Sequence, residues 1–96
     1  MNINSIPEMF CLSLRIKIIS CLLSSSKNFN ELLEITQTTR GNLSVQLSKL
    51  EEYGYLTSRK IIEKKKTKTT YTLTTFGVQQ FEEYVTLLQS IIEKSK

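Results

Sequence analysis

Two helix-capping signals stand close together near the middle of the chain, and they constrain its fold more than any other feature. Asn28 followed by Glu31 has the form of a capping box, in which two groups at a helix start bond reciprocally. Thr39 can cap a second helix. The apolar inner face of that second helix recurs at Leu43, Leu47 and Leu50. Residues 29–53 are therefore predicted to form two short helices joined by a tight turn, a helix-turn-helix unit.

The segment after this unit has the pattern of two strands separated by a basic stretch. Residues 55–62 are rich in β-branched and aromatic side chains, and residues 69–73 alternate again between apolar and polar side chains. The pattern predicts an antiparallel hairpin over residues 55–73, with its tip around residues 63–68.

The positive charge of the chain is concentrated on that predicted hairpin. The formal net charge is +4, yet residues 1–58 sum to zero and residues 69–96 sum to −1. Residues 59–68 therefore supply a net charge of +5. Their cations are Arg59, Lys60, Lys64, Lys65, Lys66 and Lys68. Such a cluster is typical of a loop that contacts nucleic-acid phosphates, where it supplies affinity rather than sequence specificity.

Apolar stripes predict long helices at both ends of the chain. Residues 8–24 carry two stripes, and Pro7 suits the first turn of that helix. Residues 75–95 follow a capping Thr74 and carry a heptad seam. The seam residues are Val78, Phe81, Val85, Leu88 and Ile92. Two such helices offer more apolar area than the small middle can cover, so we expect them to pack against their counterparts in a second chain.

Cys11 and Cys21 fall within the predicted first helix, where ten residues of rise would separate them by roughly 15 Å. That separation is too large for a disulfide, and we expect both to be small core residues. The chain contains no His and no Asp, which supply the usual zinc ligands and proton shuttles. We therefore expect no metal, no cofactor and no enzymatic activity.

The length of 96 residues suits one domain, and we expect residues 1–96 to form a single domain of the α+β class, mainly α with a small β-hairpin wing. No apolar run reaches the length of about 18 residues that a bilayer span needs. The N-terminus lacks the cationic stretch and long apolar run of a secretion signal. These patterns predict a cytoplasmic protein that does not enter a membrane.

A family resemblance adds to these patterns. The stretch from Thr39 to Tyr55, TRGNLSVQLSKLEEYGY, resembles the recognition helix of small winged-helix transcriptional regulators related to the MarR and ArsR groups. The stretch from Tyr71 to Gly77, YTLTTFG, is similar to the junction between the last strand and the following helix in those regulators. The pattern runs from about residue 10 to residue 90. The resemblance implies a winged helix-turn-helix fold and a dimer that binds double-stranded DNA as a repressor or an activator.

The predicted recognition helix has an outward face of short, mostly uncharged side chains opposite its leucines. Short side chains let a helix lie close to base edges in the major groove. At its start Arg40 could contact guanine, Asn42 could contact adenine, and Val45 could meet a thymine methyl group. The candidate set is Thr39, Arg40, Gly41, Asn42, Ser44, Val45, Ser48 and Lys49. A dimer would require a near-palindromic operator with half-sites about 34 Å apart.

Other readings stay open beside this one. Arg40, Asn42 and Ser44 would also suit the solvated start of any helix. A winged helix can serve as a protein–protein interaction module without specific DNA binding, although mixed or apolar wing residues would then be expected. RNA binding is compatible with the charge, but the chain lacks an aromatic platform for stacking single-stranded bases.

Overall fold

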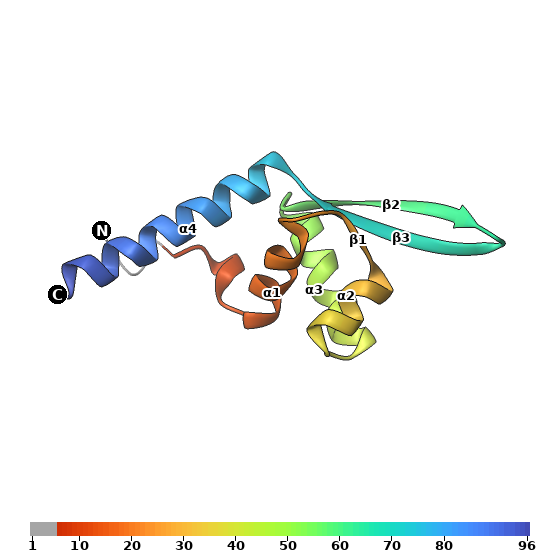
Figure 1. Ribbon diagram of the computed structural model, residues 1–96, viewed down its shortest axis with the longest axis horizontal. Coiled ribbons are helices and arrows are strands. Elements are labelled where there is room, and N and C mark those ends of the chain that lie inside the picture. The colour runs from red at the N-terminus through yellow and green to blue at the C-terminus, as the bar shows by residue number, and fades with distance from the viewer. Residues whose placement is uncertain (1–5) are drawn as a thin grey trace.

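The computed structural model describes residues 6–96, which form helices around a small antiparallel sheet. The order is a 3-10 helix η2 (Glu8–Phe10), α1 (Ser13–Leu22), β1 (Lys27–Asn28), α2 (Phe29–Thr36), α3 (Arg40–Glu52), β2 (Leu56–Glu63), β3 (Lys66–Leu73) and α4 (Thr75–Lys94). Figure 1 shows α1, α2 and α3 gathered in one body, from which the β2–β3 hairpin and α4 project in opposite directions. The predicted class, mainly α with a β-hairpin wing, is confirmed.

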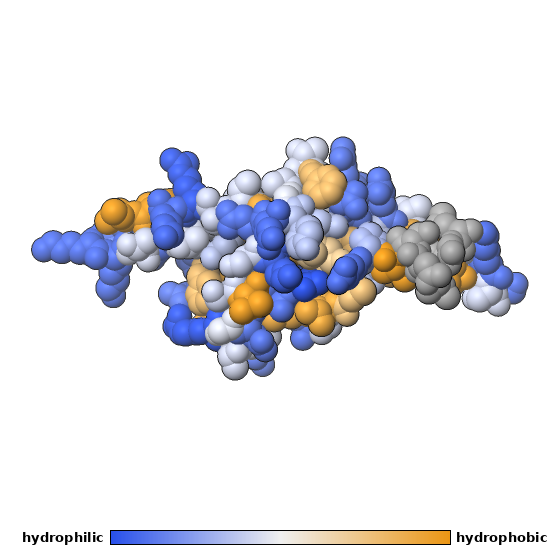
Figure 2. Space-filling model, turned by 180° about the vertical axis from the view of Figure 1, so that it is seen from behind, coloured by the Kyte–Doolittle hydropathy of each residue, from blue (hydrophilic) through white to orange (hydrophobic). Residues whose placement is uncertain are grey.

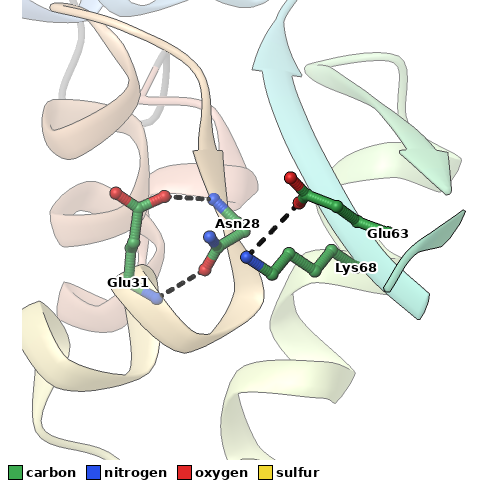
Figure 3. Close-up of polar contacts among 4 residues, drawn as sticks. All are labelled: Asn28, Glu31, Glu63 and Lys68. Atoms are coloured by element: carbon green, nitrogen blue, oxygen red, sulfur yellow. Dashed lines mark hydrogen bonds and ion pairs between the residues drawn. The ribbon is translucent and has the colours of Figure 1, made fainter. Parts of the chain in front are cut away.

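Local capping chemistry sets where the helices begin. The Asn28 side-chain oxygen accepts from the backbone N–H of Glu31 at 2.9 Å, and the Glu31 carboxylate accepts from the backbone N–H of Asn28 at 2.9 Å (Figure 3). This is the predicted capping box at the start of α2. The hydroxyls of Thr39 and Thr74 cap α3 and α4, each accepting from the backbone N–H three residues later.

The core lies between α1, α2, α3 and the base of the hairpin. Its fully buried side chains are Ile18, Ile19, Leu32, Leu43, Leu47, Leu50 and Leu56. The leucines predicted for the inner face of α3 are all in this set. An aromatic cluster extends the core toward α4, because Phe10 stacks on Tyr84 with ring centroids 4.5 Å apart and meets Tyr55 edge-on at 5.7 Å.

The hairpin keeps its predicted extent, but its second strand is longer and its turn tighter than the sequence predicted. Glu63 pairs with Lys66, so only Lys64 and Lys65 form the turn. Both have positive φ, +50° and +63°, as a two-residue type I′ turn requires. The turn lies within the predicted tip around residues 63–68 but is shorter, because strand pairing continues almost to the end of the wing.

The third strand, β1, was not predicted. It lies beside β3 in the sheet order β1-β3-β2 and pairs only two residues, Lys27 with Tyr71 and Asn28 with Thr70. Two residues are too few for a periodic pattern, so no sequence signal marked them. Beyond Asn28 the chain turns into α2, and the distal half of β3 has no strand on that side.

The N-terminal segment contradicts the prediction of one long helix over residues 8–24. The chain forms η2, passes through Leu12 in an extended conformation (φ −110°, ψ 128°), and then forms α1, which ends at Leu22. The reason is tertiary: Phe10 is only 3% exposed, buried among the rings of Tyr55, which lies just before β2, and of Phe81 and Tyr84 in α4. The break allows Phe10 to be buried while Ile18 and Ile19 of α1 also lie in the core.

The break also changes the place of one cysteine. Cys11 lies between η2 and α1 and is exposed, so its prediction as a core residue is wrong. Cys21 lies in α1, packs partly against the core, and agrees better with the prediction. Both thiols are free.

No helix within residues 6–96 is both long enough and apolar enough to span a membrane.

Candidate nucleic-acid interface

The helix α3 presents distinct sides because successive residues advance by about 100° around its axis. One flank, which carries Arg40, Ser44 and Glu51, faces the hairpin. At the C-terminal end of α3 this flank contacts β2: the Ser58 hydroxyl donates toward the two Glu51 carboxylate oxygens, at 2.9 and 3.0 Å. Burial raises the pKa of the nearby Tyr71 hydroxyl above its usual value, and the charge of Glu51 raises it further.

The opposite flank of α3 faces α1 and the N-terminal segment. Gln46 accepts a hydrogen bond from the Arg15 guanidinium at 2.7 Å, and the Lys49 ammonium lies 5.9 Å from the centre of the Tyr53 ring. Lys49 and Arg15 also line a half-open hollow of about 280 Å³ beside Glu8. Lys49, predicted to contact DNA, thus lies on the flank away from the wing.

Between these flanks lies the outward face of α3, and the side chains predicted for it are exposed. They are Gly41, Val45, Ser48 and Glu52, flanked by the exposed Asn42 and Ser44. Val45, an apolar side chain, is 56% exposed. A Cβ at Gly41 would meet no atom of residues 6–96 within 4 Å, so no contact in that part of the chain calls for glycine there.

The structure divides the wing cations among two faces and a tip. Since side chains alternate along a strand, the register puts Lys60, Ile62, Thr67 and Thr69 on the same face as Ser58. The other face carries Arg59, Ile61, Glu63, Lys66 and Lys68. Lys64 and Lys65 form the tip. All six predicted cations are exposed.

These cations are almost without partners in the part of the chain that the structure describes. Within residues 6–96 the one ion pair joins Lys68 to Glu63 at 3.6 Å, between side chains that are both more than half exposed. Figure 3 shows this pair beside the start of α2. The remaining wing cations therefore keep a charge that an external anion can neutralise.

Two apolar residues of the wing were not predicted as functional candidates. Ile61 is 45% exposed and Ile62 is 80% exposed. Figure 2 shows a small hydrophobic patch among hydrophilic side chains near the end of the wing. As β-branched residues, Ile61 and Ile62 only indicated a strand in the sequence. Their exposure depends on how far the hairpin extends beyond the core, which the sequence does not indicate.

The seam predicted for the C-terminal helix lies on α4 and is only partly covered. Val78, Phe81 and Leu88 are half-buried, whereas Val85 is 39% exposed and Ile92 is 56% exposed. A hollow of about 370 Å³ runs beside them, lined by Leu23, Phe81, Glu82, Val85 and Thr86. The buried side chain of this helix, Leu87, belongs to the neighbouring stripe.

No group of three or more His, Cys, Asp or Glu side chains within residues 6–96 is arranged to hold a metal ion.

Comparison with protein families finds one model that matches most of this chain. Residues 14–92 match the family described as winged helix DNA-binding domain, a span that includes the helix-turn-helix, the wing and most of α1 and α4. A comparison with curated protein sequences finds no match.

Solved structures with the same fold come from several regulators. A transcriptional regulator homologue from Pyrococcus horikoshii OT3 is 22% identical, with a TM-score of 0.83 over 92% of this chain and 88% of that chain. A protein from Enterococcus faecalis V583, described as a MarR-family transcriptional regulator, is 20% identical, with a TM-score of 0.80 over 97% and 87%. Bacillus subtilis PadR, solved in complex with operator DNA, is 22% identical, with a TM-score of 0.66 over 72% of this chain and 44% of that chain.

Proposed function

Because this chain belongs to the winged helix DNA-binding domain family, we propose that it is a transcriptional regulator that binds double-stranded DNA as a homodimer. One observation carries the proposal. The outward face of α3, with its short side chains, and a wing in which five cations have no ion-pair partner within residues 6–96 belong to one module and are joined by the Glu51–Ser58 contact. The operator complex of PadR supports the same use of the fold.

The two parts of this interface have different roles in the proposal. Asn42, Ser44 and Val45 contact base edges in the major groove, with Gly41 and Ser48 allowing close approach. The exposed Val45 suits a thymine methyl group, and the open space at Gly41 suits a nearby DNA backbone. The wing cations contact phosphates and supply affinity for any sequence.

Dimerisation through α4 and the N-terminal helix is the second part of the proposal. It is supported by the exposed side chains of Val85 and Ile92 and by the hollow beside Leu23. A contiguous exposed apolar surface is unfavourable in water and often marks a protein–protein interface. A two-fold dimer would present two copies of α3 about 34 Å apart and would require a near-palindromic operator. A regulator of this kind acts where the chromosome is, which we propose is the cytoplasm.

The first test is a fluorescence-anisotropy titration against a random-sequence duplex of about 30 base pairs at several salt concentrations between about 50 and 200 mM. We expect the logarithm of the affinity to fall steeply and linearly with the logarithm of the salt concentration. Single-stranded DNA of the same length is the matched probe and should bind less tightly. Absence of binding to the duplex at the lowest salt would contradict the proposal.

A protein–protein interaction module is the second candidate function. The observation that favours it is Ile62, which exposes 80% of its surface at the end of the wing, where a DNA contact needs no large apolar group. A protein partner would bury Ile62, so an Ile62→Ser change would abolish that interaction. The same change should weaken duplex binding by less than about twofold if phosphates are the partners of the wing.

A further inference from the structure

A polar hollow lies where the starts of α2 and α3 meet the edge of β3. It holds about 210 Å³. Its polar lining comes from four elements, β1, α2, α3 and β3: Asn28, Asn30, Arg40, Thr67, Lys68 and Thr69. The hollow exists because β1 ends at Asn28, which leaves the edge of β3 beyond Thr70 without a neighbouring strand. Among the residues that the structure describes, none with a carboxylate lines it.

The Arg40 guanidinium lies on the wall of this hollow rather than on the outward face of α3. Its Nη1 atom is 3.5 Å from the side-chain oxygen of Asn30, and its central carbon is 5.9 Å from the centre of the Phe29 ring. The hydrogen bond is long and the aromatic contact weak, so neither neutralises the charge. Within residues 6–96 no carboxylate lies within ion-pair distance of Arg40.

Lys68 approaches the same hollow from the wing. Figure 3 shows its side chain extending from β3 toward the start of α2, where Asn28 lies. Its ion pair with Glu63 measures 3.6 Å and is solvent-exposed. An exposed pair of this kind contributes little free energy, so Lys68 can exchange its partner for a stronger anion.

We propose that this hollow binds one backbone phosphate of the duplex, contacted by Arg40 and Lys68 together. The proposal rests on the proposed function and deepens it. A guanidinium matches two oxygens of a phosphate, and Thr67 and Thr69, which also line the hollow, carry hydroxyls that can donate to it. Arg40 therefore fixes the position of α3 and the wing on the backbone, in place of the guanine contact expected from the sequence.

The test is a double-mutant cycle of Arg40→Ala and Lys68→Ala, measured by anisotropy on the random-sequence duplex. A base-reading side chain has no fixed base to read on such a probe, so a loss there reports a phosphate contact. We expect about a tenfold loss of affinity for each single variant. The double variant should lose much less than the product of the two, because either change already breaks the shared contact.

The matched control is Lys60→Ala, which removes a wing cation on β2 that does not line the hollow. Combined with Arg40→Ala, its loss should equal the product of the single losses. Equal melting temperatures should show that all variants fold, since these side chains are exposed.

Three results would overturn the phosphate site. One is an unchanged affinity of Arg40→Ala for the random duplex. Another is a double variant of Arg40 and Lys68 whose loss of affinity equals the product of the two single losses. In both cases wild-type binding and its salt dependence would leave the proposed function standing. Failure of the wild-type chain to bind any duplex would instead overturn the proposed function and the phosphate site together.

Discussion

The wing and α4 both project from the helical body, in opposite directions, and together they give the molecule its long dimension of 56 Å against 25 and 21 Å (Figure 1). The wing exposes a row of cations and pairs its own backbone groups through the hairpin ladder. The second half of α4 satisfies its backbone internally as well, but it exposes the apolar side chains of Val85 and Ile92.

This difference indicates two kinds of partner. Charges stay hydrated until a polyanion arrives, and their attraction to phosphates needs no close packing, so a thin projecting hairpin suffices. Exposed aliphatic side chains gain free energy only by leaving water, which requires a complementary packed surface such as a second copy of α4. We therefore expect changes in α4 to act on assembly and changes in the wing to act on DNA affinity.

The largest effect should follow from carboxylates on the α4 seam. Val85→Glu with Ile92→Glu would bury charges without partners at a two-fold interface and should raise the dimer dissociation constant by on the order of 1,000-fold. Sedimentation velocity at tens of micromolar should then show a monomer where the wild type is a dimer. The control Gln79→Glu adds one carboxylate on another side of the helix and should remain dimeric. A monomeric wild type would contradict the proposal that α4 forms a dimer interface.

The joint between the wing and α4 should be the next most sensitive position. A Cβ at the buried Gly77 would collide with the backbone carbonyl oxygen of Tyr55, which also accepts a hydrogen bond from the Thr74 N–H at 3.1 Å. Gly77→Ala should therefore lower the free energy of unfolding by about 3 kcal/mol in urea titrations followed by circular dichroism.

Gly41→Ala is the matched control for that change. It introduces the same methyl group where no atom lies within 4 Å. It should raise the free energy of unfolding by up to about 0.5 kcal/mol, because alanine favours a helix over glycine. All variants need one protein concentration, since dimerisation couples stability to concentration. A large loss at Gly41 as well would show that α3, and not the joint, is the sensitive element.

The wing should respond in affinity rather than in assembly. Changing Lys64, Lys65 and Lys66 to Gln should weaken binding to every duplex, by about 100-fold at low salt, and should reduce the slope of log affinity against log salt by up to about 2.7. The variant should sediment as the wild type does. A loss confined to one sequence would mean that the tip reads bases, contrary to its assignment as a phosphate contact.

The smallest effect concerns the shape of the wing alone. Lys64 and Lys65 hold a positive φ that Asn and Gly adopt more readily, so Lys64→Asn with Lys65→Gly should stabilise the hairpin by about 1 kcal/mol. Hydrogen exchange of the β2 and β3 amides should slow by about fivefold while that of α4 is unchanged. Alanine at both positions removes the same charge without relieving the turn and should show no slowing.

Much of the fold could be predicted because its signals are local. The caps at Asn28, Thr39 and Thr74 bond within three residues, so their pattern in the sequence is also their geometry. The leucine spacing of α3 identified its buried side correctly for the same reason. The break before α1 could not be predicted, because Phe10 is held by rings more than forty residues away in the chain.

The sequence by itself determined the composition of the candidate site: a short-chained outward face on one helix and a run of cations on one hairpin. Only the tertiary structure decided how these groups are shared among surfaces. It brought Arg40 and Lys68 to the lining of one hollow, put Lys49 on the far flank of α3, and left Ile62 in water. The physical reason is that side-chain type and helix phase are local properties, whereas the meeting of two elements depends on where a third one, here the two-residue β1, ends.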